Sequence, residues 1–177
     1  MKNSLDKHTD PLPFQFYFIP VCILSVTGLA TSLYLSISHY RIYTDIGYSS
    51  FCAISKAINC DTVSQSPYSV FMELPVPVWG VLGYAFFLAL LIPAGFRSIR
   101  PVRMWRLLFI LAAIFSVISI VLAGISSFVI HSFCVMCILT YGVNFALAFY
   151  AWLIPRRFET KSFVDGLKMD LQVMTVN

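Results

Sequence analysis

The sequence predicts an all-α integral membrane protein, in which four transmembrane helices form a bundle and a long outer loop carries a short surface helix. The first observation is the composition. Of the 177 residues, 59% are hydrophobic and only 11% are charged, whereas about a quarter of an average soluble domain is charged. The second is a set of uncharged stretches long enough to cross a bilayer, and the third is the one-sided placement of basic residues between them. Together these observations exclude a soluble globule and a disordered chain.

Four spans are predicted, because a helix needs about 20 apolar residues to cross the hydrocarbon core. The first has an apolar core too long for a cleaved signal peptide, so we interpret it as an uncleaved anchor. The uncharged run from Leu107 to Pro155 is about twice one span, so it must cross, turn near His131 and cross back. The predicted single membrane domain, 1–177, contains spans at 14–37, 75–95, 106–130 and 133–154, an outer loop at 38–74 and a tail at 155–177.

The basic residues set the predicted orientation, since Lys and Arg in short loops stay on the cytoplasmic side. Ten of the twelve lie on the side that holds both termini, and only Arg41 and Lys56 lie on the other. Both termini are therefore predicted to be cytoplasmic. Topology accounts for the net charge of +4, so we expect no nucleic-acid partner. The ten residues are Lys2, Lys7, Arg97, Arg100, Arg103, Arg106, Arg156, Arg157, Lys161 and Lys168.

Small residues recur at helical spacing within the spans. In lipid such stripes let helices approach closely, so they predict a compact bundle. They are Ser25, Gly28, Ser32 and Ser36 in the first span, Gly80 and Gly83 in the second, and Ala112, Ser116, Ser119 and Ala123 in the third.

The predicted topology places four of the five cysteines on the outer side, where disulfides form and persist. Cys22 falls within the first span and is expected to act as a small apolar residue. Cys52 and Cys60 lie in the outer loop, and Cys134 and Cys137 form a Cys-x-x-Cys at the start of the last span. Two outward thiol pairs indicate thiol–disulfide chemistry, with these four cysteines as the candidate catalytic residues.

The Cys-x-x-Cys lies in the first turn of a helix, where unpaired amide groups and the helix dipole stabilise a thiolate. This placement favours a reactive pair over a static disulfide. Tyr141 follows on the same helical face, and Asn144 and Ala148 continue that face. A phenol at this depth can donate a hydrogen bond to a carbonyl of a lipid-soluble ligand, or it can simply belong to the interfacial belt of aromatic residues.

The outer cysteines are eight residues apart, which on one straight helix would separate their Cα atoms by about 12 Å, too far for a disulfide. Either the segment folds back, or Cys52 and Cys60 pair at times with different partners, as a shuttle requires. Apolar residues then follow at spacings of four, three and four, which predicts a short segment on the membrane surface over the outer end of the bundle. They are Val63, Pro67, Val70 and Leu74.

Four cysteines could serve three other purposes. Spacings of x7 and x2 match no familiar zinc knuckle, so no metal is expected. Two structural disulfides are a second possibility, although a membrane bundle rarely needs them. Haem attachment requires His directly after the Cys-x-x-Cys, where Ile138 stands instead.

Ser66 and Tyr141, together with the four outer cysteines, form a recognisable set of motifs. The motifs are Cys52-x7-Cys60 in the first outer loop, Ser66 six residues later, Cys134-Val135-Met136-Cys137 opening the last span, and Tyr141 four residues beyond. With these motifs the chain resembles the vitamin K epoxide reductase family over roughly residues 20–154. The DsbB-type oxidases share the chemistry but carry their Cys-x-x-Cys in the first outer loop.

The resemblance implies a disulfide relay, in which a reduced thioredoxin-like protein hands two electrons to the outer pair and a quinone receives them. It implies that Cys52 faces this partner and that Cys60 exchanges with Cys134. It also implies that Cys137 forms the adduct with the quinone.

For the quinone pocket, the resemblance implies that Tyr141 donates a hydrogen bond to a quinone carbonyl and that Ser66 helps to hold the loop over the site. Trp79 and Tyr84 match bulky pocket positions. Vertebrate members carry a quinone-binding Asn where this chain reads Pro75-Val76-Pro77, which favours plain quinone chemistry over epoxide reduction. Many bacterial members carry a fused thioredoxin-like domain, for which the tail is too short, so we expect a separate DsbA-like partner.

We therefore expect an enzyme of the bacterial cytoplasmic membrane that re-oxidises an extracytoplasmic thioredoxin-like thiol oxidase and so supports disulfide bond formation. The expected electron acceptor is a membrane quinone, either ubiquinone or menaquinone/phylloquinone. One alternative is a vitamin K quinone or epoxide reductase. Another is a non-catalytic membrane scaffold with structural disulfides.

Overall fold

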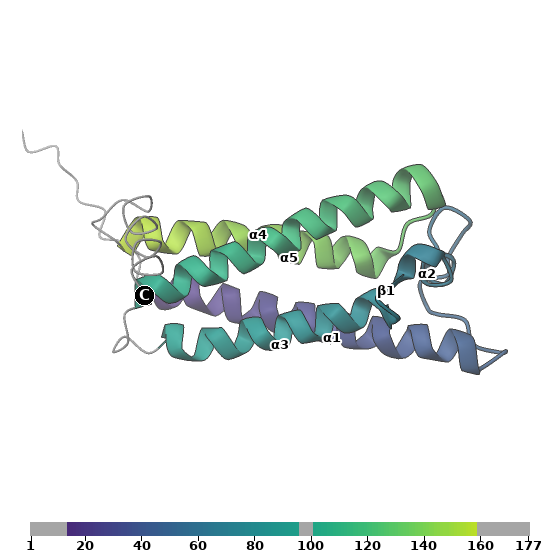
Figure 1. Ribbon diagram of the computed structural model, residues 1–177, viewed down its shortest axis with the longest axis horizontal. Helices are drawn as coiled ribbons and strands as arrows, with labels where there is room; N and C mark the ends of the chain where they lie inside the picture. The colour runs from purple at the N-terminus through teal and green to yellow at the C-terminus, as the bar shows by residue number, and fades with distance from the viewer. Residues whose placement is uncertain (1–13, 96–100, 159–177) are drawn as a thin grey trace, which may run out of the picture.

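The computed structural model describes residues 14–95 and 101–158. Within these residues the chain forms four long helices that run side by side as a bundle (Figure 1). Each is long and apolar enough to cross a membrane. The predicted fold class is confirmed: the chain is an all-α integral membrane protein built on four transmembrane helices. The helices are α1 (Gln15–Thr44), α3 (Val76–Gly95), α4 (Pro101–Ile125) and α5 (Val135–Phe158).

The helices extend beyond the predicted spans at both ends of the bundle, since α4 begins at Pro101 rather than at 106 and α5 ends at Phe158 rather than at 154. Helix α1 continues to Thr44, beyond the predicted end of the span at residue 37. Helix α4 is extended by a π-helical turn, η2 (Ser126–Ile130), and the chain then reverses at His131, whose backbone is left-handed (φ 54°). Only four residues therefore separate η2 from α5.

Residues 45–75, here called the outer segment, connect α1 to α3. The predicted surface helix is present as α2 (Cys60–Ser64). The helical spacing from Val63 to Leu74 was misleading, because the chain leaves the helix after Ser64 and turns into a hairpin. Met72 and Glu73, both left-handed, close this hairpin. Its parts are η1, a 3₁₀ turn (Pro67–Ser69), and the antiparallel strands β1 (Val70–Phe71) and β2 (Leu74–Pro75).

Small residues allow the helices to approach closely, as their spacing predicted. Gly28 of α1 faces the ring of Tyr84 on α3, and a Cβ at position 28 would overlap that ring. Gly80 leaves room for the side chain of Ser32 on α1. Gly83 does the same for the ring of Phe115 on α4. The close packing of α3 against α1 and α4 therefore depends on the absence of side chains at these positions.

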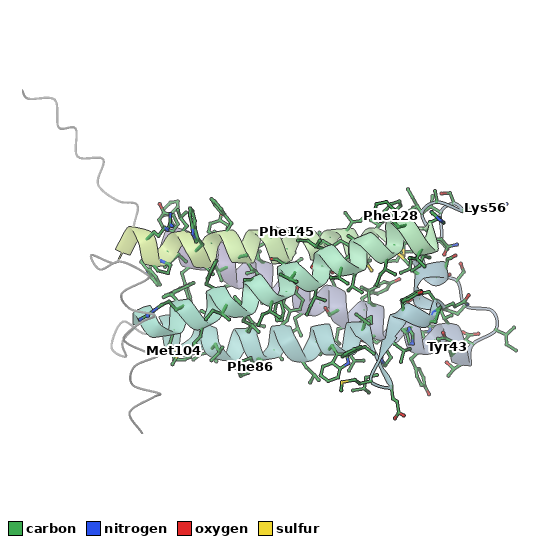
Figure 2. All side chains as sticks on the ribbon, turned by 45° about the horizontal axis from the view of Figure 1, so that its top comes forward. Tyr43, Lys56, Phe86, Met104, Phe128 and Phe145 are labelled. Carbon is green, nitrogen blue, oxygen red and sulfur yellow. A yellow bond between two sulfur atoms is a disulfide. The ribbon has the colours of Figure 1, made fainter. Side chains whose placement is uncertain are left out.

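The sides of the bundle that face away from its core carry many large apolar side chains. Phe87, Leu108 and Leu147 are fully buried between the helices. Phe86 and Phe145 instead project outward from the middle of the bundle, with 57% and 47% of their surface exposed (Figure 2). A continuous apolar exterior of this kind requires lipid rather than water as its solvent.

The two ends of the bundle differ in what they carry. The starts of α1 and α4 and the ends of α3 and α5 lie at one end, and the outer segment covers the other (Figure 1). Lys56 lies at the covered end (Figure 2). Of the ten basic residues on which the predicted orientation rests, six lie outside the described residues, and so do the ends of the predicted domain and most of the tail. The orientation of the termini therefore stays a prediction.

Candidate functional site

The outer cysteines form a disulfide because the outer segment folds back on itself. Ala53 pairs antiparallel with Asn59, which brings the Cα atoms of Cys52 and Cys60 to 5.6 Å. Of the two arrangements that the sequence left open, the structure has the first. Cys52 is only 1% exposed, so the cysteine expected to face a partner lies beneath the surface in this form.

Backbone hydrogen bonds join the outer segment to the turn before α5. The amide of Asn59 donates to the carbonyl of Phe133, and the amide of Phe133 donates to the carbonyl of Ala57, both at 2.9 Å. This short parallel bridge sets Cys60 beside Cys134. The sulfur atoms of Cys52, Cys60 and Cys134 all lie within 4.8 Å of one another, and all three residues are buried.

Polar groups around α2 hold its first residue, Cys60, in place. The side chain of Asn59 caps this helix by accepting hydrogen bonds from the amides of Asp61 and Thr62. One oxygen of Asp61 accepts from the amide of Ser50, whose hydroxyl lies 3.5 Å from the sulfur of Cys52. The helix cap and the disulfide are therefore parts of one compact unit.

The inner cysteines occupy the start of α5 as free thiols. The amide of Cys137 donates to the sulfur of Cys134, at an N–S distance of 3.4 Å. The pKa of Cys134 is lowered, first because the Cys137 thiol donates to it and then because the amides of Cys137 and Met136 do, and these effects outweigh burial, which raises it. A thiol at this position is therefore ionised at lower pH than usual, which makes it a better nucleophile and leaving group.

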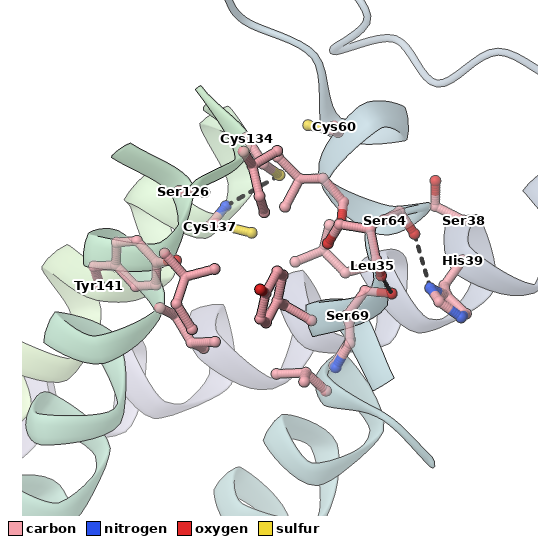
Figure 3. A pocket seen from close by; sticks show the side chains of 18 residues that line it. Leu35, Ser38, His39, Cys60, Ser64, Ser69, Ser126, Cys134, Cys137 and Tyr141 are labelled. Atoms are coloured by element: carbon pink, nitrogen blue, oxygen red, sulfur yellow. Dashed lines mark hydrogen bonds between the residues drawn. The ribbon is translucent and has the colours of Figure 1, made fainter. Parts of the chain in front are cut away.

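An apolar cavity of about 80 Å³ lies next to the three clustered sulfur atoms of Cys52, Cys60 and Cys134. Figure 3 shows Cys134, Cys137 and Tyr141 along one side of this cavity, with Ser64, Ser69 and His39 across from them. A second cavity of about 160 Å³ adjoins it deeper in the bundle and shares Cys137 and Tyr141 with it. We call these the outer and the deep cavity. The inner cysteine pair therefore borders a space suited to an apolar ring.

The remaining pocket residues predicted from the sequence all line one of the two cavities. Ser66 lines the outer cavity, and its hydroxyl donates to the carbonyl of Val63, which fixes the turn after α2. Trp79 lines the deep cavity, and its indole N–H donates to the carbonyl of Phe71, which fastens the hairpin to α3. Tyr84 also lines the deep cavity and is buried.

Two features of the site were not predicted from the sequence. Asn144 lines the deep cavity and accepts a hydrogen bond from the hydroxyl of Tyr84 at 2.5 Å. Its position on the face of Cys137 and Tyr141, in an otherwise apolar span, was a usable signal, because polar residues at membrane depth are commonly functional. The second feature is a hydrogen bond of 2.8 Å between the Nδ1 atom of His39 on α1 and the hydroxyl of Ser64 on α2. These residues are 25 positions apart, and no sequence pattern indicates that they meet.

Comparisons with known proteins match most of the chain to one family. A sequence model of the vitamin K epoxide reductase family matches residues 19–152. Vitamin K epoxide reductase complex subunit 1 of Mus musculus is 28% identical over 149 residues, which cover 78% of this chain and 90% of that protein. The Rattus norvegicus protein of the same name is 32% identical over 136 residues, which cover 70% of this chain and 81% of that protein.

Proposed function

Because the chain belongs to the vitamin K epoxide reductase family, a family of membrane oxidoreductases, we propose that it passes electrons from a thiol donor to a quinone. The observation that carries the proposal is the cluster of three sulfur atoms within 4.8 Å, directly beside an apolar cavity. The outer pair is the entry point for electrons, and the inner pair is the exit.

In the first step a reduced thioredoxin-like protein is oxidised by the outer disulfide. One of its thiolates attacks the sulfur of Cys52 and releases Cys60 as a thiolate. Its second thiol attacks the mixed disulfide and releases Cys52, so the partner leaves with a disulfide and the outer pair holds two electrons and two protons. Cys52 is 1% exposed, so the partner must first displace the outer segment around it.

In the second step the electrons cross from the outer to the inner pair, which is oxidised at this stage. Cys60 attacks the sulfur of Cys134 and releases Cys137. Cys52 then attacks Cys60 and releases Cys134, which restores the outer disulfide and leaves the inner pair as two thiols. The pairing in the structure, a Cys52–Cys60 disulfide with Cys134 and Cys137 free, is the product of this step.

In the third step the quinone is reduced. Cys137 adds to the ring as a thiolate, and Cys134 attacks the sulfur of Cys137, which forms the inner disulfide and expels the hydroquinone. Both hydroquinone protons come from the two thiols. Tyr141 lines both cavities, and its hydroxyl makes no hydrogen bond to any other described residue, so it is free to donate to a quinone carbonyl.

The proposed setting follows the charge distribution of the sequence. With both termini in the cytoplasm, the outer segment and both cysteine pairs face the extracytoplasmic side, where a separate DsbA-like thiol oxidase operates. The electron acceptor is then a quinone of the same bilayer, ubiquinone or menaquinone/phylloquinone. The bilayer in which we place the protein is the bacterial cytoplasmic membrane.

The test is turnover by purified protein in lipid nanodiscs, with a reduced DsbA-like protein as donor and a short-chain ubiquinone as acceptor. We expect quinone reduction only when both are present. Cys137→Ala should abolish it, whereas Cys22→Ala, which changes the one cysteine that belongs to neither pair, should have no effect. Turnover that survives Cys137→Ala would overturn the proposal.

Reduction of vitamin K epoxide is a second candidate, because the mouse and rat relatives carry that activity in their names. Consumption of vitamin K epoxide with a dithiol reductant tests it. The expected result is little epoxide consumption beside rapid quinone reduction, because the chain reads Pro75-Val76-Pro77 where vertebrate members of the family carry a quinone-binding Asn. Equal rates would assign the epoxide activity as well.

A further inference from the structure

The deep cavity has one polar wall in surroundings that are otherwise mostly apolar. Tyr84 of α3, Ser119 of α4 and Asn144 of α5 meet there, and all three are buried, with 2%, 2% and 7% of their surface exposed. Cys137 and Tyr141 line the same cavity. Three helices therefore contribute polar groups to one wall beside a reactive thiol.

The hydrogen bonds fix the orientation of the Asn144 amide. Ser119 donates its proton to the carbonyl of Phe115 at 2.9 Å, so its oxygen can accept from the Asn144 nitrogen at 2.8 Å. The amide oxygen of Asn144 accepts from the hydroxyl of Tyr84. An amide nitrogen carries two hydrogens, and only one of them has an acceptor among the described residues. One N–H of Asn144 therefore stays available at the cavity wall.

Tyr141 supplies a second available donor nearby. Residues 141 and 144 are three apart on α5, which places their Cβ atoms about 5–6 Å apart on one helical face. Cys137 precedes Tyr141 by one turn on the same face. Two donors one turn apart suit a ring that has acceptors at opposite positions and lies alongside this face of the helix.

We propose that Asn144 donates a hydrogen bond to the second carbonyl of the quinone, opposite the carbonyl bound by Tyr141. This inference rests on the proposed quinone reduction and assigns the ligand class, a para-quinone with two opposed carbonyls. Tyr84 and Ser119 act as positioning residues that hold the amide in place. A ring with one carbonyl leaves the buried N–H without an acceptor, so the site binds it less tightly.

Variants of the polar wall test this assignment. Asn144→Leu should raise the KM for a short-chain ubiquinone about three- to tenfold, the value of one buried hydrogen bond, and should change kcat less. Tyr84→Phe should raise the KM less, because the Asn144 amide is still present and has lost only the hydrogen bond that orients it. The matched control is Ser116→Ala, because Ser116 is also buried and contacts the Asn144 backbone but does not line the cavity. An equal KM for Asn144→Leu and wild type, or an equal rise in the control, would overturn the inference.

A measurement on the wild-type protein does not depend on how the variants fold. Infrared difference spectra of bound ubiquinone, ¹³C-labelled at one carbonyl or the other, report the two carbonyl stretches separately. Both should shift to lower frequency on binding, and a single shifted band would overturn the inference. Absence of quinone turnover in the wild type would instead refute the proposed function, so the two failures are distinguishable.

Discussion

In the bundle, helices pack closely where glycine leaves out a side chain, whereas the outer segment is held by a local disulfide and by hydrogen bonds to residues that lie far away in sequence. Gly28 and Gly80 bring α1 and α3 together. The outer segment depends on its disulfide, on the bridge between Asn59 and Phe133, and on the bond between His39 and Ser64. We therefore expect the stability of the bundle to be independent of redox state, and that of the outer segment to fall when its disulfide is reduced.

This difference suits the proposed relay, because the cysteine that must meet the partner is buried. Closing the loop of nine residues from Cys52 to Cys60 contributes roughly 2–3 kcal/mol by chain entropy. Reduction removes this contribution from the outer segment alone. We infer that the segment opens during the exchange while the bundle keeps the quinone cavity intact.

The largest predicted effect is that of a variant that loses turnover while its helices keep their stability. Cys60→Ala should reduce thiol-driven turnover to background, because the outer disulfide can no longer form. Its effect on the thermal unfolding of the helices, followed by circular dichroism, should be small. Parallel loss of helical stability and turnover would show that the two regions are one cooperative unit.

The next prediction concerns the bundle itself. Gly28→Ala should lower the free energy of unfolding by about 1–3 kcal/mol, because the added Cβ overlaps the ring of Tyr84, which its bond to Asn144 holds in place. Gly124→Ala in α4 is the control, since a Cβ there meets no atom within 4 Å. Denaturation in mixed micelles compares the two. The control should be neutral or stabilising, and equal destabilisation by both would contradict the packing argument.

A smaller effect is predicted where the two regions meet. Ser64→Ala removes the hydrogen bond to His39, which ties α2 to α1 and contributes about 1 kcal/mol. Amide hydrogen exchange should become faster in residues 60–66 and stay unchanged in the middle of α1. Thr62→Ala, on an exposed residue of the same helix, should leave both rates unaltered. Faster exchange within the middle of α1 would mean that the outer segment also supports the bundle.

The same two regions differ in how far the sequence could predict them. The bundle follows from local properties, namely apolar length, small residues at helical spacing and scarce charge, so its four helices were predictable. The outer segment follows from contacts between distant residues, such as the bond from Asn59 to Phe133, and these leave no periodic signal. The sequence therefore left the pairing of Cys52 open and gave a misleading helical spacing from Val63 to Leu74.

The candidate site lies between these cases. Cys134, Cys137 and Tyr141 share one helical face, so the spacing alone placed them together. Their position beside Cys60 depends on the fold of the outer segment and was expected only through the family resemblance. Asn144 shares that face too, but its role depends on hydrogen bonds with Tyr84 of α3 and Ser119 of α4. No sequence pattern predicts these contacts.

The smallest predicted effect concerns the Cys134 thiol, at the junction of the two regions. Its lowered pKa means that, at a pH between the lowered and the ordinary value, more of it is thiolate than in an unfolded peptide of the same sequence. The pH profile of its alkylation by iodoacetamide should therefore lie at lower pH than that of the peptide. Cys137→Ala removes the largest cause of the shift and should move the profile to higher pH, because burial, the next largest effect, then opposes the two backbone donors.

Fragment-ion mass spectra assign the label to Cys134 rather than to Cys137, and Cys22→Ala serves as the common background, because Cys52 and Cys60 are joined and do not alkylate. The two proteins to compare then differ only at position 137. A profile that stays in place after Cys137→Ala would assign the shift to the backbone amides at the start of α5. In that case the reactivity of the inner pair would come from the helix terminus, and the second thiol would serve only the exchange itself.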